Sequence, residues 1–199
     1  LDTGAMYRAL SWYLIKENIN YHNRKNLSSF LSNISIKFKS GTGSNQHVII
    51  NNHDVTEKIR SQEISSIVSS IASIEEVREF LVKEQRKIGD IGGIVAEGRD
   101  IGSKVFPQAE LKIFLTATIN ERAKRRKNEL EAMGCGNINF EQLKNEIEKR
   151  DFDDSNRKIS PLIKAKDAIE IISDGYTINQ VVEKILEIYF ETIPKELHL

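Results

Sequence analysis

The sequence predicts an α/β fold in which helices cover both faces of a mostly parallel sheet. Three short apolar runs, Ile94–Ala96, Leu111–Leu115 and Ala168–Ile172, have the composition of buried strands. Helical patterns separate the second run from the third, and such alternation is typical of parallel sheets, because parallel neighbours need a long crossover connection. With 199 residues the chain is long enough for one sizeable core and a small inserted subdomain.

The composition excludes several functional classes. Lys and Arg together number 29, as do Asp and Glu, so the formal net charge is +0 and no global field favours nucleic acid or an anionic membrane. The single cysteine, Cys135, excludes an intrachain disulfide and fits a reducing compartment. The four histidines lack the spacing of a metal site, and no apolar run approaches the roughly 20 residues of a membrane span. With no signal peptide before the first helix, the sequence predicts a cytoplasmic protein without a metal site of its own.

Amphipathic helices account for most of the remaining sequence. Their apolar residues recur at the three- and four-residue spacing that places one stripe against a core. The expected helices are 4–18, 27–31, 62–73, 75–88, 121–131, 140–150 and 178–194. In the helix 75–88 we expect Val77, Phe80, Leu81 and Ile88 to face inward, with Arg78 on the first turn. A loop is expected over Asp151–Ser160.

A small antiparallel insertion is expected between the second and third of these helices. Apolar residues alternate from Ile34 to Phe38, Gly41–Asn45 has turn composition, and Val48–Ile50 returns the chain. Asn51–Asp54 is a second turn. No helix follows Gly41-Thr42-Gly43, so a hairpin turn is favoured over a phosphate-binding loop.

Charged residues gather where ligands bind in open α/β sheets. Arg99 and Asp100 follow the run 94–96, between Gly98 and Gly102, which permit a sharp turn and close approach to a ligand. Arg8 lies near a helix N-terminus, where the helix dipole disfavours cations, and this indicates an anionic partner. The segment from Arg150 to Arg157 has arginines without obvious local partners, which suits a lid over phosphates. A surface ion pair or a solvated arginine is the alternative in each case.

Five segments resemble one family, the bacterial-type cytidylate kinases. They are LDTGAMYRAL, SQEISSIVSSIASIEEVRE, VAEGRDIG with VFPQAELKIFLTA after it, ERAKRR, and EKRDFDDSNRKISPL. The resemblance implies one P-loop kinase-like domain over 1–199, a three-layer fold with a mostly parallel sheet. Residues 33–60 would be an inserted antiparallel subdomain that binds the nucleoside monophosphate (NMP), and residues 119–160 a helical lid. The implied activity is phosphoryl transfer from ATP to CMP or dCMP, giving CDP or dCDP and ADP, with Mg²⁺.

The resemblance also implies a role for individual residues. The phosphate-binding positions are Arg8, Arg99, Arg150 and Arg157, and the cytosine-reading positions are Ser69, Arg78 and Asp100. The ribose position is Asp154, and Thr3 and Tyr7 line the same pocket. Arg122, Arg125 and Arg126 are lid residues facing the transferring phosphoryl group, and Glu97 lies near the metal. The implied catalytic set is Arg99, Arg122, Arg126, Arg150 and Arg157. A guanidinium fork matches phosphate oxygens bidentately, and a carboxylate accepts a hydrogen bond from the amino group of cytosine.

The sequence departs from the family pattern in one respect. The motif GxxxxGK[ST], whose backbone cradles phosphates and whose hydroxyl binds Mg²⁺, does not occur in the 199 residues. The chain opens at Leu1 as if within a fold, so we expect an N-terminally truncated domain that lacks its first strand and phosphate loop. That strand would lie between the run ending at Glu97 and Leu111–Leu115, and its absence predicts an inactive, poorly folded fragment.

Other functions remain open on the sequence alone. One is a nucleoside monophosphate kinase with a different base preference. Another is a non-catalytic nucleotide-binding or RNA-associated protein, although the neutral pI argues against RNA. The expected partners are CMP or dCMP and ATP rather than nucleic acid or a membrane. A monomer is expected unless the chain is fused to another domain, as in relatives fused behind a pantoate ligase.

Overall fold

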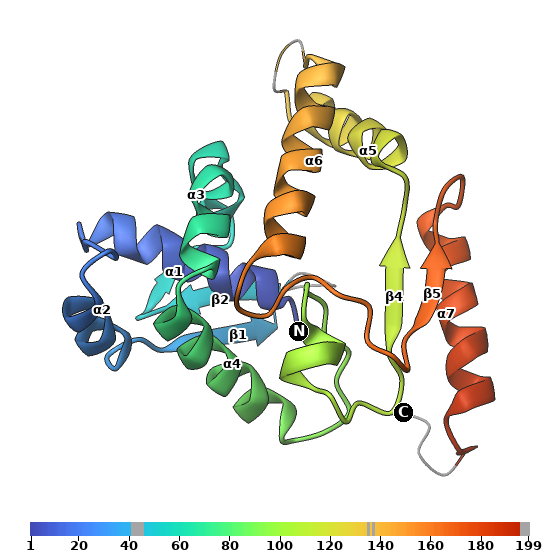
Figure 1. The fold of residues 1–199 in the computed structure, drawn as a ribbon, viewed down its shortest axis with the longest axis horizontal. Coiled ribbons are helices and arrows are strands. Elements are labelled where there is room, and N and C mark those ends of the chain that lie inside the picture. Colours follow the sequence, from blue (N-terminus) through green and yellow to red (C-terminus); the bar gives the residue numbers. More distant parts are fainter. Residues whose placement is uncertain (41–45, 135, 137, 196–199) are drawn as a thin grey trace. The chain divides into compact units, whose positions relative to one another are not determined.

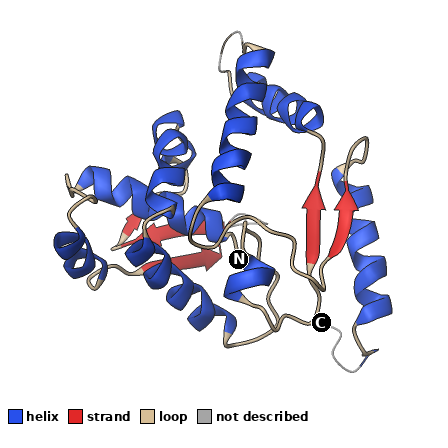
Figure 2. Cartoon of the chain, viewed as in Figure 1, coloured by secondary structure: helices blue, strands red, loops and turns tan. Residues whose placement is uncertain are grey.

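The structure, a computed structural model, describes residues 1–40, 46–134, 136 and 138–195 (Figures 1 and 2). The expected turn 41–45, Cys135 and His198 lie outside these residues. The chain divides into two compact units. Unit 1 contains Leu1–Ile101 and Arg157–Ile159, and unit 2 contains Gly102–Asn156 and Ser160–Leu199.

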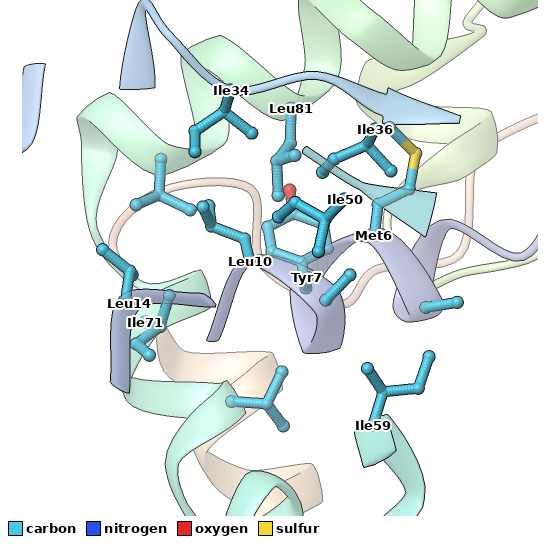
Figure 3. Packing of buried hydrophobic residues seen from close by; sticks show 14 of the residues in the cluster. Met6, Tyr7, Leu10, Leu14, Ile34, Ile36, Ile50, Ile59, Ile71 and Leu81 are labelled. Carbon is cyan, nitrogen blue, oxygen red and sulfur yellow. The ribbon is translucent and has the colours of Figure 1, made fainter. Parts of the chain in front are cut away.

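Unit 1 is built around its first helix. Its helices are α1 (Thr3–Lys16), α2 (Arg24–Leu31), α3 (Gln62–Ala72) and α4 (Glu75–Gly89), with a short 3₁₀ turn, η1 (Lys58–Arg60). α1 packs against α3, α4 and β2, so its apolar residues are central to the core. Met6, Leu10 and Leu14 are at most 1% exposed, and Figure 3 shows them among residues of the neighbouring elements. The predicted helices of this unit are confirmed to within two or three residues at their ends.

Local side chains fix where these helices begin. Asp2, Asn23 and Ser61 precede α1, α2 and α3, and each accepts a hydrogen bond from a backbone N–H of the first turn. Such caps satisfy N–H groups that have no partner within the helix. The sequence therefore sets these boundaries through single polar residues placed before each apolar stripe.

The predicted antiparallel insertion is present in unit 1. Its strands are β1 (Ile36–Ser40), β2 (Gln46–Ile50) and β3 (His53–Asp54), in the order β1-β2-β3. The register pairs Ile36 with Ile50, so that both side chains reach the core. Asn51 and Asn52 make the turn into β3 with φ of 43° and 68°, a left-handed conformation that asparagine tolerates.

Asp54 gives this small sheet a dependence on acid pH. Its carboxylate accepts hydrogen bonds from the hydroxyl and N–H of Thr56 (2.7 and 3.0 Å) and meets His47 Nδ1 at 2.8 Å. These contacts, those of Thr56 first, lower the pKa of Asp54 from 3.8 to about 2. The stabilisation is therefore complete above pH 4 and disappears as pH falls through 2.

We expect Asp54→Asn to flatten the decline in the free energy of unfolding between pH 4 and pH 2. Urea denaturation at several pH values, compared with the parent protein, measures that slope. Because Asp54 is exposed, the change is small but confined to this window. A variant that keeps the parent's slope across the window would contradict the assignment.

Unit 2 contains a parallel strand pair joined by a helical hairpin. The elements are β4 (Ile113–Thr116), α5 (Ile119–Ala132), α6 (Phe140–Asn156), β5 (Ile169–Ile172) and α7 (Ile178–Thr192), preceded by a π-helical turn, η2 (Ile101–Val105), at the boundary with unit 1. β4 and β5 pair in parallel, with Ile113 opposite Ile169. In Figure 1 the two strands lie side by side, and α7 runs beside β5. The parallel direction expected of strands separated by helices is confirmed for these two runs.

Three expectations about these segments are wrong. The run 94–96 forms no ladder: only an isolated parallel bridge joins Glu97 to Asp2, and Val95 is 82% exposed. The strands of unit 2 are not buried on both faces, since Leu115 and Ile172 expose 52% and 61%. Both departures accompany small sheets, because the side chains of a parallel strand are fully buried only where other strands flank it and helices cover both faces of the sheet. The helix expected to end at Arg150 continues to Asn156, since no glycine or proline interrupts it.

None of the helices that the structure describes combines the length and apolar character that crossing a membrane requires.

Candidate functional site

The sequence-predicted site residues are distributed over both units. Unit 1 carries Thr3, Tyr7, Arg8, Ser69, Arg78, Glu97, Arg99, Asp100 and Arg157, and unit 2 carries Arg122, Arg125, Arg126, Arg150 and Asp154. Each group is described within its own unit.

The main feature of unit 1 is a buried ion pair between Arg78 and Asp100. Arg78 lies on the first turn of α4, and Asp100 follows Gly98 and Arg99. Their side chains are 4% and 6% exposed, and Arg78 Nη2 donates to Asp100 Oδ2. Arg78 Nη1 donates to the carbonyl oxygen of Ala72 at 3.0 Å, so the last turn of α3 also holds the guanidinium. Arg78 Nε is buried and has no hydrogen-bond partner among the described residues.

Tyr7 lies against this pair. Its ring centroid is 5.4 Å from Arg78 Cζ, within the range of a cation–π contact. Burial raises the pKa of Tyr7 to about 12, although the positive charges of Arg78 and Arg157 act to lower it. The hydroxyl therefore keeps its proton at neutral pH. The influence of Arg157 on this pKa also places that arginine near Tyr7. We call Tyr7, Arg78 and Asp100 the ion-pair cluster.

Close approach of the chain to itself explains Gly98. Thr3 donates from its hydroxyl to the carbonyl oxygen of Glu97 (2.6 Å) and from its N–H to the same oxygen (3.2 Å). A Cβ on Gly98 would lie 2.3 Å from Thr3 Oγ1 and 2.9 Å from Ile101 Cδ1. A glycine is required here because Thr3 occupies the space that a side chain would need. Thr3 itself is 3% exposed.

Arg8 has the anionic partner that its position in α1 indicates. Asp2 accepts a hydrogen bond from Arg8 Nη2 at 2.8 Å, and its other oxygen accepts from the N–H of Ala5 at 2.8 Å. The same carboxylate therefore caps α1 and neutralises the arginine. Both side chains are partly exposed, at 28% for Arg8 and 35% for Asp2. Elsewhere in unit 1, Arg99 is exposed and Ser69 is half-buried on α3.

The arginines of α5 in unit 2 are held by the chain itself. Arg122 contacts Asp151 of α6 at 2.6 Å, and Arg126 contacts Glu129 at 2.7 Å. Arg125 donates two hydrogen bonds to Ser173, one to the side-chain hydroxyl and one to the backbone carbonyl oxygen. On α6, Arg150 is exposed and Asp154 is buried.

The expected lack of local partners around Arg150 and Arg157 is wrong, since both residues interact with other groups in the structure. Sequence reasoning counted charges in the adjacent segment, whereas partners for arginine also come from backbone carbonyl groups and distant elements. Arg122 illustrates this, because its Nε donates to the carbonyl oxygen of Ala117 at 3.1 Å.

Two polar residues of unit 1 were missed by the sequence reasoning. Asp2 carries a recognisable signal, since an aspartate directly before a helical pattern is a common N-cap. Gln85 lies seven residues after Arg78, and therefore on the same face of α4, and is 1% exposed. Nothing in its neighbours marks it as buried. Among the described residues, no group of three or more His, Cys, Asp or Glu could hold a metal ion.

Comparisons with known proteins agree on one family. A family model described as "Cytidylate kinase" matches residues 1–191. A protein named "Bifunctional pantoate ligase/cytidylate kinase" from Prochlorococcus marinus strain MIT 9312 is 67% identical over 199 residues, which are 100% of this chain and 39% of the relative. Proteins of the same name from strains MIT 9215 and NATL1A are 66% identical over 199 residues and 49% identical over 197 residues. These cover 100% and 99% of this chain, and 39% and 38% of the relatives.

Proposed function

The chain belongs to the cytidylate kinase family, and from that membership we propose that it is the monophosphate-binding and lid-bearing part of an enzyme that transfers phosphate from ATP to CMP or dCMP. The products are CDP or dCDP and ADP. The chain spans about two fifths of the length of the curated relatives named above. We therefore assign this activity to a longer protein that works in the cytoplasm on small-molecule partners.

The buried pair of Arg78 and Asp100 is the observation that supports this proposal most. A carboxylate can only accept hydrogen bonds, and the amino group of cytosine donates them. Uracil presents a carbonyl oxygen at the same place, and two acceptors repel one another. The guanidinium holds the carboxylate in place and offers Nε, a buried donor, to an acceptor of the base. Ser69 is the third base-reading residue in this proposal.

To bind the phosphates of the substrates, arginine side chains would exchange a partner within the protein for a phosphate group. We assign the acceptor phosphate to Arg8, Arg99, Arg150 and Arg157, and the transferring phosphoryl group to Arg122 and Arg126. An ion pair as exposed as Arg8–Asp2 is typically worth only about 0–1 kcal/mol. A phosphate with more charge and three oxygens forms stronger, bidentate contacts with a guanidinium. Asp154, Thr3 and Tyr7 would border the ribose and the base.

We propose that two segments move to enclose the substrate when it binds. Residues 33–60, which contain β1, β2 and β3, are the NMP-binding insertion, and residues 119–160, which contain α5 and α6, are the lid. Phosphoryl transfer needs little covalent chemistry from the protein. Its arginines would align the two nucleotides and neutralise charge, and lid closure would exclude water.

The donor site would need a segment outside these 199 residues. The sequence has no GxxxxGK[ST] motif, and the described residues gather no cluster of metal ligands. They therefore do not fit ATP and Mg²⁺ on their own. A further strand with its phosphate loop would supply the backbone cradle for the phosphates. In this proposal the longer protein supplies both, and carries a pantoate ligase domain as the relatives' names state.

The test is a panel of CMP, dCMP, UMP and AMP, each offered with ATP and Mg²⁺ to the longer protein and to the 199-residue chain. We expect turnover of CMP and dCMP by the longer protein only. Preference for another base would make the enzyme a different monophosphate kinase. Absence of turnover with all four nucleotides would favour a non-catalytic binding protein. Turnover by the 199 residues alone would refute the proposed external phosphate loop.

A further inference from the structure

Gln85 is a buried amide that the structure leaves without hydrogen bonds. It lies on the inner face of α4, two turns after Arg78, and is 1% exposed. Neither its Oε1 nor its Nε2 has a hydrogen-bond partner among the described residues. A buried polar group without a partner costs about 1–3 kcal/mol. Leucine or methionine would fit this apolar face without that cost, so the amide calls for a specific partner.

Tyr7 is the neighbour that can supply one. Its hydroxyl is also buried without a partner among the described residues, and in Figure 3 the hydroxyl oxygen lies on the side of the ring toward Leu81, one turn before Gln85 on α4. A weak hydrogen bond from Gln85 lowers the pKa of Tyr7, although the two side chains do not reach full hydrogen-bond geometry. A contact that lowers the pKa of a phenol is one donated to its oxygen, so Gln85 Nε2 is the donor and the Tyr7 hydroxyl oxygen the acceptor.

Tyr7 connects Gln85 to the buried ion pair of Arg78 and Asp100. The tyrosine ring lies 5.4 Å from the Arg78 guanidinium, whose other contacts are Ala72 and Asp100. A ring that is held only by apolar contacts can tilt, and a tilt displaces the guanidinium that rests on it. A hydrogen bond at the far end of the ring removes that freedom.

We propose that Gln85 is a positioning residue for base selection: its amide donates from Nε2 to the Tyr7 hydroxyl oxygen at full hydrogen-bond geometry when nucleotide binds, and thereby fixes the ring under Arg78. This inference rests on the proposed function, because base selection is measured as the preference for CMP over UMP. Gln85 does not contact the nucleotide in this proposal. It acts on cytosine through Tyr7 and Arg78.

A double-mutant cycle in the longer protein tests this coupling. Gln85→Met removes the amide at nearly constant volume, and Tyr7→Phe removes only the hydroxyl. We expect each change to lower the ratio of kcat/KM for CMP to that for UMP by about fivefold, the scale of one hydrogen bond. The double variant should lose no more than either single variant, because both remove the same interaction. Leu81→Met, on the same buried face of α4, is the matched control and should leave the ratio unchanged.

The outcomes separate this inference from the function on which it rests. If the parent protein does not phosphorylate CMP, the proposed function fails. If it does and Gln85→Met leaves the CMP to UMP ratio unchanged, or if the two losses multiply in the double variant, the positioning role is refuted. Should Gln85→Met not fold, Tyr7→Phe decides alone, because an unchanged ratio means that its hydroxyl positions nothing. A lower melting temperature without a change of ratio would identify Gln85 as a structural residue only.

Discussion

Asp100→Ala is expected to lower the free energy of unfolding by about 3–5 kcal/mol, because it leaves the buried charge of Arg78 uncompensated. Both side chains are almost completely removed from water, at 4% exposure for Arg78 and 6% for Asp100. Urea titration with hydrogen exchange read at the α4 backbone measures the loss, and this readout remains local to unit 1 in a longer protein. The same variant should lose the preference for CMP over UMP.

Two comparisons sharpen this expectation. Lys87→Ala breaks an exposed pair with Glu84, with side chains 57% and 24% exposed, and should cost less than about 1 kcal/mol. The double variant Arg78→Met/Asp100→Leu removes both charges, so it should recover most of the stability while selectivity stays lost. If Asp100→Ala costs no more than Lys87→Ala, the pair is not buried as described.

Leu10→Ala is expected to destabilise unit 1 by about 2–5 kcal/mol, through lost burial and the cavity that remains. Leu10 is 0% exposed on α1, which packs against α3, α4 and β2. These elements are held in place by their own contacts and cannot collapse fully into the space. Hydrogen exchange at α1 under increasing urea gives the change in free energy.

Ile15→Ala on the same helix is the matched control for Leu10→Ala. Ile15 is 37% exposed, so this change should cost less than about 1.5 kcal/mol. Equal losses in the two variants would mean that α1 is not the centre of the core.

The sequence was sufficient for the family, the helices and the pairings that local patterns determine. The resemblance carried by five segments is confirmed by the family match over residues 1–191. The hairpin of β1 and β2 follows from alternation of apolar residues on both sides of a turn. The parallel direction of β4 and β5 follows from two apolar runs separated by helices, whereas their direct pairing was not predicted.

Long-range contacts account for what the sequence did not predict. Burial of Gln85 depends on elements that pack against α4, and no local pattern encodes them. Val95 is exposed although its run is apolar, because burial also needs a neighbouring strand. The convergence of the phosphate-binding arginines on a nucleotide stays a prediction.

The parallel pairing of β4 with β5 has a consequence for how the chain folds. Ile113 and Ile169 meet across an intervening segment that contains all of α5 and α6. Closing so long a loop has an entropic cost before any strand contact compensates it. The α5–α6 hairpin needs only neighbouring residues, so we expect it to form early and the strands to zip together late. During synthesis, therefore, the apolar edge of β4 stays unpaired until β5 has left the ribosome.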